Sequence, residues 1–503
     1  MNSTSEDRGC SDLLNSEDRG RSDLFNNGIN NGSQKLRSPS LLPLLASLFF
    51  YLLSISLLIP IFPDLIALSI TQEGTDDEDE IEILTTERYG LLQVIKSVLD
   101  LFSLSVLGAL SDYLGRRRVL LFCLIMALIQ VILLSPPQIL FNFWSGNDNY
   151  YDCLIISRVL SGISDGVIPI TFASLTDLSG GDALRLPIFY GKVGLVLGLA
   201  FTTGPITGAI LYGATGGISV PVIVSISSCV ISLCIYYFKV NDTLPPSRRT
   251  GLPIRWWKSF EFWFSLTPLN QIKFLLTSPL LGAYVVVYFF HEFADSVYMS
   301  WIIYFEWRFN WSVMLVGIYI SFVGIVVGVF QGILLRPITV RLNAAYPNSF
   351  ETKLMLVPLL VSTLHFAIVG VVSKGVLLFP LLLMSGIGSF CLPVLRGIVL
   401  RTQRAENFGA VNSLFSTIGV VSSISGNIVY PRVLKSSQEG TGFGAMLGEG
   451  GLNYVAAAIM SLSFFAALRA TRLYNPVDTG NLAKGGGDNK AAAVDEINCN
   501  ELL

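Results

Sequence analysis

The chain has 503 residues, of which 52% are hydrophobic and only 14% are charged, and its mean hydropathy is +0.60. Soluble globular proteins carry about 25% charged residues, so this composition excludes a soluble globular chain and indicates a polytopic membrane protein. The net charge of −3 says little here, because the location of charges determines membrane topology and their total does not.

The first 38 residues are polar and rich in Asn, Gly and Ser, and we expect them to be disordered. The first apolar run begins near Leu41 and is too long for a cleavable signal peptide, so we interpret it as a retained membrane helix. It is predicted to end at Pro60-Ile-Phe-Pro63, which leaves it without an acidic residue. The segment from Glu73 to Glu87 is strongly acidic and suits an exposed loop outside the cytoplasm.

Further apolar segments follow, each long enough to cross a bilayer. They are predicted at residues 89–110, 118–135, 152–176, 187–213, 218–238, 279–303, 313–335, 354–373, 376–400, 409–430 and 450–468. With the first segment they make twelve transmembrane helices in an all-α fold.

Most of the Lys and Arg residues near predicted helix ends fall on one side of the membrane. The other side carries only Arg88, Arg308, Lys374, Arg432 and Lys435. Positive residues accumulate in cytoplasmic loops, so both termini are predicted to be cytoplasmic. The sequence leaves open whether the membrane is the plasma membrane or that of an internal organelle.

A short charged turn separates the second and third predicted helices. It reads Gly108-Ala-Leu-Ser-Asp112-Tyr-Leu-Gly115-Arg116-Arg117-Arg118. Glycine lets backbones approach, and an aspartate can pair with a guanidinium or cap a neighbouring helix. An ordinary positively charged loop would explain the Arg run, but it would not explain the two glycines and the aspartate at these spacings.

The predicted fifth helix contains small residues at regular intervals, namely Gly191, Gly204-Pro205 and Gly208. Small residues permit close helix packing, and a Gly-Pro pair bends a helix. Tight packing without any role in coupling would also explain these glycines.

Ionisable side chains inside a bilayer are costly, so each is a functional candidate. Lys96 and Asp100 are one turn apart in the second helix, and Arg158 and Asp165 lie on one face of the fourth. We predict these pairs as proton-coupling sites, because burial favours protonation of a carboxylate and a neighbouring cation favours its release. A static ion pair that only fixes helix packing would explain each pair equally well.

Other polar residues in predicted helices are candidates for contact with a substrate or a second proton. They are His291, Glu292 and Asp295 in the seventh helix, Arg396 in the tenth and Asn412 in the eleventh. The stretch from His291 to Asp295 lacks the second His of a zinc-protease motif, and the chain has no glycine-rich phosphate loop. We therefore expect no metal, no cofactor and no enzymatic activity.

The turn from Gly108 to Arg118 resembles the signature loop of the major facilitator superfamily, with Tyr113 where the family usually has Lys or Arg. The Arg158 to Gly166 stretch resembles the intramembrane arginine-glycine motif of that superfamily, and the small residues of the fifth helix are similar to the antiporter motif of its proton-driven exporters. Residues 41–470 more narrowly resemble tetracycline/proton antiporters and related eukaryotic orphan carriers.

The resemblance implies a major facilitator fold with two pseudo-symmetric six-helix halves. The expected divisions are a disordered segment at 1–38, the halves at 39–238 and 276–470, a cytoplasmic central loop at 239–275 and a disordered tail at 471–503. Family likeness also implies that Asp112, Arg116 and Arg117 latch the cytoplasmic ends of neighbouring helices, and that this latch breaks when the transporter changes its facing.

Two departures from the tetracycline exporters bear on the substrate. Those exporters carry an acidic residue in helix one, whereas the first helix predicted for this chain has none. Arg396 of this chain occupies a site that is usually neutral in the exporters. Tetracycline is therefore not the expected substrate.

We interpret the chain as a secondary transporter that moves a small organic solute by alternating access, with proton-coupled antiport as the favoured reaction. Its expected partners are the solute, H+ and the lipid bilayer, without nucleic acid, and we expect a monomer. One alternative is a facilitator or a proton symporter that imports its solute. Another is a non-transporting membrane scaffold that acts through its basic loop and tails.

Overall fold

The computed structural model describes residues 41–136, 150–179, 185–244, 249, 279–346, 349–401 and 408–473. The regular structure in these ranges is helical throughout. The predicted disordered segment at 1–38, most of the central loop and nearly all of the predicted tail lie outside the described residues, so these predictions remain untested.

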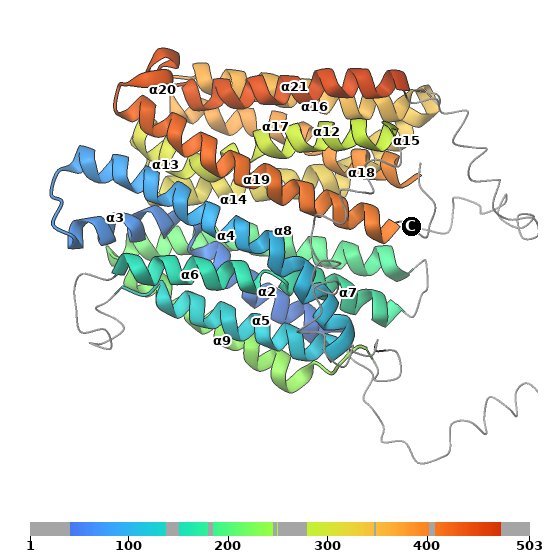
Figure 1. Ribbon diagram of the computed structural model, residues 1–503, viewed down its shortest axis with the longest axis horizontal. Helices are drawn as coiled ribbons and strands as arrows, with labels where there is room; N and C mark the ends of the chain where they lie inside the picture. The colour runs from blue at the N-terminus through green and yellow to red at the C-terminus, as the bar shows by residue number, and fades with distance from the viewer. Residues whose placement is uncertain are drawn as a thin grey trace, which may run out of the picture. The chain divides into compact units, whose positions relative to one another are not determined.

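The described helices form two groups that follow each other in the chain (Figure 1). The first half contains α2 (Leu41–Leu57), η1 (Ile59–Ile61), α3 (Phe62–Gln72), α4 (Glu78–Leu114), α5 (Arg116–Leu133), α6 (Tyr150–Ser164), α7 (Val167–Ser179), α8 (Arg185–Thr215) and α9 (Ser219–Lys239). The second half contains α12 (Pro279–Asp295), α13 (Val297–Phe309), α14 (Val313–Val329), η5 (Phe330–Leu334), α15 (Leu335–Ala345), α16 (Phe350–Val371), η6 (Gly375–Leu377), α17 (Leu378–Gly388), α18 (Cys391–Arg401), α19 (Phe408–Gln438), α20 (Gly442–Leu447) and α21 (Gly451–Leu473).

Eleven described spans are long and apolar enough to cross a membrane. Several consist of two or three consecutive helices, such as α6 with α7 and α12 with α13. The α5 helix is the twelfth member of the bundle; it has 18 residues and begins with three Arg. The expected all-helical, twelve-helix architecture is therefore confirmed.

The first membrane span is longer than predicted. It runs from Leu41 to Gln72 through α2, η1 and α3. Pro60 and Pro63 each lie at the first or second position of a new helical piece, where the missing N–H has no intrahelical bond to lose. The prolines therefore divide the helix without ending it, and Asp64 lies inside the span. The prediction that the first helix has no acidic residue was wrong.

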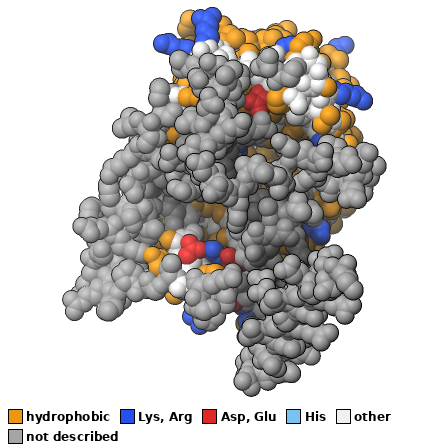
Figure 2. Space-filling model, turned by 90° about the vertical axis from the view of Figure 1, so that its right-hand side faces the viewer, with side chains coloured by type: hydrophobic (Ala, Val, Ile, Leu, Met, Phe, Trp, Pro, Cys, Tyr) orange, Lys and Arg blue, Asp and Glu red, His pale blue; other side chains and the backbone are white. Residues whose placement is uncertain are grey.

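The two ends of the bundle differ in charge. We call the end with the α4–α5 turn at Gly115 the basic end, and the end with the turn from Glu73 to Asp77 the acidic end. Figure 2 looks onto the basic end, where Lys and Arg side chains lie along the rim of the described surface.

The halves contact each other through α4 and α19 toward the acidic end. Lys435 Nζ lies 2.5 Å from Glu87 Oε2, and Asn427 Nδ2 donates to Ser97 Oγ at 3.2 Å. A Cβ at Gly90 would lie only 2.7 Å from the ring of Pro431, so the two helices touch along their surfaces there. The two halves are therefore in contact along α4 and α19 toward the acidic end, and we call this the closed side of the bundle.

The contact between α8 and α14 is also restricted to one part of each helix. Gly317 and Gly324 pack against backbone atoms of α8. Nearer the basic end, at Gly328 of α14, Gly332 of η5 and Gly191 of α8, an added Cβ would meet no described atom within 4 Å. The described helices of the two halves therefore diverge toward the basic end.

Candidate functional site

The charged turn between α4 and α5 binds together helices of the first half. Arg116 lies 2.6 Å from Asp112 of α4 and 3.1 Å from Asp177 at the end of α7. Arg117 donates to the carbonyl of Tyr237 on α9 at 2.7 Å. The predicted latch residues thus join neighbouring helices at the basic end, while their role in switching remains a prediction.

The two glycines of this turn have different surroundings. Gly115 has φ +97°, a conformation that favours glycine, and an added Cβ would overlap the ion pair between Asp242 and Arg249. At Gly108 an added Cβ would meet no described atom within 4 Å. Close approach of neighbouring residues therefore requires glycine at position 115. In this conformation it does not require glycine at position 108.

The small residues of α8 form its contact with α2. An added Cβ would overlap the Ser56 hydroxyl at Gly204 and the Leu57 carbonyl at Gly208. Pro205 lies inside the continuous α8 helix, and its carbonyl lies against Gly317 of the other half. This part of α8 consequently packs on both halves, as a pivot would.

Two charged residues of α4 and one in the turn between α6 and α7 form one group, which we call the charge cluster: Lys96, Asp100 and Asp165. Lys96 Nζ lies 2.6 Å from Asp100 Oδ2 and 3.0 Å from Asp165 Oδ2. The helices come this close because Gly162 packs on the carbonyl of Lys96. One lysine therefore serves two carboxylates from two segments of the chain.

Arg158 does not belong to the charge cluster, so the expected pairing with Asp165 was wrong. It forms no ion pair or hydrogen bond with a described residue, and its Nε is buried without a partner. Its guanidinium carbon lies 4.3 Å from the ring centroid of Phe62.

Two candidates for substrate contact in the second half, Glu292 and Arg396, lie near Tyr288. Arg396 donates to the Tyr288 hydroxyl at 2.9 Å, and Glu292 lies one helical turn from the same tyrosine on α12. His291 is buried, and its Nδ1 lies 3.7 Å from Asp295. Asn412 lies on α19, but its side chain is outside the described part of the chain.

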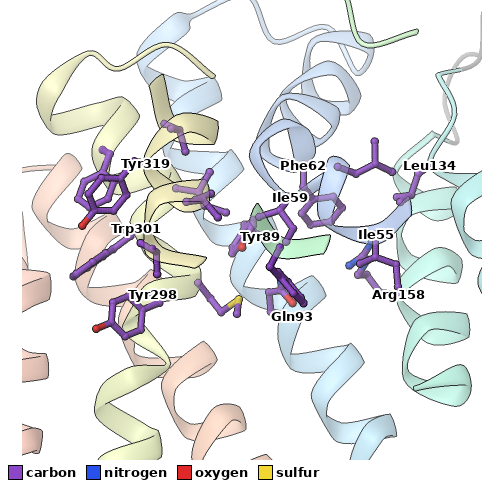
Figure 3. Close-up of a pocket in the computed structure, with 18 of the residues that line it drawn as sticks. Ile55, Ile59, Phe62, Tyr89, Gln93, Leu134, Arg158, Tyr298, Trp301 and Tyr319 are labelled. Atoms are coloured by element: carbon purple, nitrogen blue, oxygen red, sulfur yellow. The ribbon is translucent and has the colours of Figure 1, made fainter. Parts of the chain in front are cut away.

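A cavity of about 260 Å³ lies between the two halves (Figure 3). Phe62 and Arg158 line it on the first half, and Tyr298, Trp301 and Tyr319 form a wall on the second. We call it the central cavity. Transporters of inverted-repeat folds bind substrate between their repeats, so its position suits a substrate site.

Two acidic residues near the central cavity escaped the sequence analysis. Asp64 and Glu306 each have a buried carboxylate oxygen without a hydrogen-bond partner among the described residues. The predicted first helix ends at Pro63, so Asp64 falls just outside it. Allowing proline in the first turn of a helix would have placed it in the membrane.

Comparisons with known proteins agree with this architecture. The profile of the Major Facilitator Superfamily matches residues 44–427. The tetracycline resistance protein, class C, of Escherichia coli is 22% identical over 69% of this chain and 80% of that protein. The human hippocampus abundant transcript 1 protein is 24% identical over 65% of this chain and 62% of that protein.

The crystal structure of the human organic anion transporter MFSD10 (TETRAN) superposes with a TM-score of 0.61 at 20% identity, covering 86% of this chain and 100% of that one. The chain therefore belongs to the Major Facilitator Superfamily, as a multi-pass membrane transporter and not an enzyme.

Proposed function

We propose that this protein is a proton-coupled secondary transporter of a small organic solute, working by alternating access with its basic end in the cytoplasm. The observation that carries the proposal is the charge cluster. Lys96 holds Asp100 and Asp165 in one ionic group that is only partly exposed. Buried carboxylates that share a cation are suited to exchange a proton during a transport cycle.

The orientation follows from the distribution of positive charge, since Lys and Arg favour cytoplasmic loops. With the basic end inside, the contacts of α4 with α19 close the outer side, and the diverging helices face the cytoplasm. The described conformation is then inward-facing.

Antiport is the first candidate for the direction of coupling. It is supported by the small residues of α8 and by the similarity to tetracycline resistance proteins. In an antiporter, proton and solute bind alternately, so a cationic solute would compete with the proton for Asp100 and Asp165.

Symport is the second candidate, favoured by the charge balance near the cavity. Lys96, Arg158, Asp100 and Asp165 together carry no net charge when both carboxylates are ionised. A bound proton would leave one positive charge, which an anionic solute could balance. Proton and anion would then travel together.

The test is proton flux in proteoliposomes of purified protein, recorded with a pH dye while solutes of different charge are added. We expect solute-triggered proton movement that disappears in Asp165→Asn and persists in Asp152→Asn, a change of an exposed aspartate on the same span. The direction of proton movement distinguishes antiport from symport. Solute movement without protons would favour a facilitator.

The scaffold alternative predicts a different pattern. Under it, neutralising Asp100 and Asp165 would leave cellular function intact, while deletion of residues 239–273 would abolish it. Loss of function in both aspartate variants, with the deletion tolerated, would support transport.

A further inference from the structure

Among the described residues that line the central cavity, Arg158 is the only charged one. Gln93 and Gln130 supply the remaining non-aromatic polar groups among the described residues of its lining. An unpaired guanidinium is costly in an apolar cavity, because burial removes its water without supplying a counter-charge. The cavity therefore presents one unsatisfied positive charge.

The nearby carboxylates do not satisfy Arg158. Asp100 Oδ2 and Asp165 Oδ2 both lie against Lys96, and neither forms an ion pair with Arg158. The flat side of the guanidinium is covered by Phe62 at 4.3 Å, and such stacking leaves the N–H groups at its edge available. Guanidinium N–H groups match carboxylate, sulfonate and phosphate oxygens in pairs.

The other wall of the cavity suits an aromatic ring. Tyr298, Trp301 and Tyr319 line the cavity from α13 and α14, on the side opposite Arg158 (Figure 3). Trp301 is fixed in place, since its Nε1 donates to Asn453 at 2.9 Å. Tyrosine and tryptophan rings bind flat apolar groups by offset or edge contacts.

The volume limits the size of the ligand. Drug-sized ligands occupy pockets of about 300–1,000 Å³, and this cavity, at about 260 Å³, is just below that range. It has room for one or two rings and an acidic group.

We propose that the central cavity binds a small aromatic organic anion, whose acidic group pairs with Arg158 and whose ring lies on the wall of Tyr298, Trp301 and Tyr319. The inference rests on the proposed function, because a cavity between the halves is a substrate site only in a carrier. It assigns Arg158 to solute selection and leaves proton exchange to the charge cluster.

The test uses three probes with the same ring and different charge: 2-naphthoate, 2-naphthamide and 2-naphthylmethylamine. Their binding to the purified full chain in detergent is measured by thermal stabilisation at neutral pH. We expect naphthoate to bind tightest and the amine weakest. Equal binding of the three probes, or tightest binding of the amine, would overturn the proposal without any variant.

Variants then test the role of Arg158. Arg158→Gln should weaken naphthoate binding at least tenfold, about 1.4 kcal/mol, and leave naphthamide binding nearly unchanged. Arg158→Lys should lose less, and Arg341→Gln, a change of an exposed arginine, should bind like the unaltered protein. Unchanged naphthoate affinity in Arg158→Gln would contradict the assignment. If that variant does not fold, the charge series on the unaltered protein still decides.

Binding and flux separate this inference from the proposed function. Naphthoate binding that depends on Arg158, with no solute moved in proteoliposomes, would retain the site and refute the transport proposal. Proton-coupled flux of neutral or cationic solutes, with naphthoate unbound, would retain transport and refute the anion site.

Discussion

At the scale of single residues, the main finding is that Lys96 holds two carboxylates that are far apart in the sequence. Asp100 is one turn away on α4, and Asp165 comes from the turn between α6 and α7. The i, i+4 pairing on α4 was predictable from helical spacing. The contact with Asp165 required knowledge of how α4 and α6 pack around Gly162.

Removal of the shared cation should destabilise the protein. In Lys96→Gln, two carboxylates remain close together without a positive partner, and breaking buried pairs typically costs about 3–5 kcal/mol. We expect a clearly lower melting temperature, partly restored in the Lys96→Gln/Asp100→Asn double variant. Lys374→Gln, on an exposed lysine, is the control. Strictly additive effects of the two changes would show that the pair is not coupled.

The turn at the acidic end should contribute a small pH-dependent stability. Arg88 donates two hydrogen bonds to Glu73, at 2.7 and 2.5 Å, and they lower the pKa of Glu73. This stabilisation is complete above the unfolded pKa of about 4.3 and is lost as the pH falls through the lower folded value. The pair is largely exposed, so its contribution should stay within about 1 kcal/mol.

The measurement is the melting temperature of Glu73→Gln and of the unaltered protein between neutral pH and about pH 3. The difference between them should shrink as the pH falls. Glu80→Gln, on an exposed residue of the same acidic stretch, should show no such convergence. A difference that is constant over this range would contradict the role of the Glu73 carboxylate.

At the scale of elements, the fifth span shows how small residues act through helix packing. Gly204 and Gly208 touch α2, whereas an added Cβ at Gly191 would meet no described atom within 4 Å. The sequence predicted a helix whose small residues allow close packing. The spacing alone could not distinguish a glycine that is packed against a neighbouring helix from one that is not. That distinction depends on where the neighbouring backbone lies.

Two alanine substitutions provide a matched comparison within α8. In Gly208→Ala the new methyl group overlaps the Leu57 carbonyl, which cannot move without bending α2. Overpacking of this kind costs typically about 1–3 kcal/mol. We therefore expect a lower melting temperature and reduced yield for Gly208→Ala and almost no change for Gly191→Ala. Equal effects of the two substitutions would refute the close packing.

The first span illustrates a different limit. Pro60 and Pro63 in an apolar run predicted a helix end, and the structure instead shows three helical pieces in one span. Each proline occupies a position where a new piece starts, so it loses no intrahelical bond. Whether such a proline ends a span or only divides it depends on whether the following segment packs against apolar residues of neighbouring helices.

At the scale of the whole molecule, the arrangement of the halves suggests one end of a transport cycle. The α4–α19 contacts must separate before the acidic end can open, and the divergent ends of α8 and α14 must approach each other. Rocking of two rigid halves around a central site would accomplish both.

A disulfide across the closed side should stop this motion. A Cβ at Gly90 would lie 2.7 Å from Cβ of Pro431, so cysteines at both positions need only a small shift to reach bonding distance. We expect oxidised Gly90→Cys/Pro431→Cys to bind solute from the basic end and to lose transport, which a reductant restores. The Pro431→Cys single variant, which leaves Gly90 in place, should transport in both redox states. Transport by the fully cross-linked protein would exclude alternating access through this side.

The sequence by itself determined the membrane class, the number of spans and the superfamily resemblance, because span length, charge placement and short motifs are local properties. It also placed Lys96, Asp100, Arg158 and Asp165 inside the membrane. Only the tertiary structure decided that Lys96 pairs with both carboxylates, that Arg158 faces the central cavity and that Asp64 belongs to the first span. The physical reason is that these relations depend on distances between helices, and those distances are determined by packing over the whole bundle.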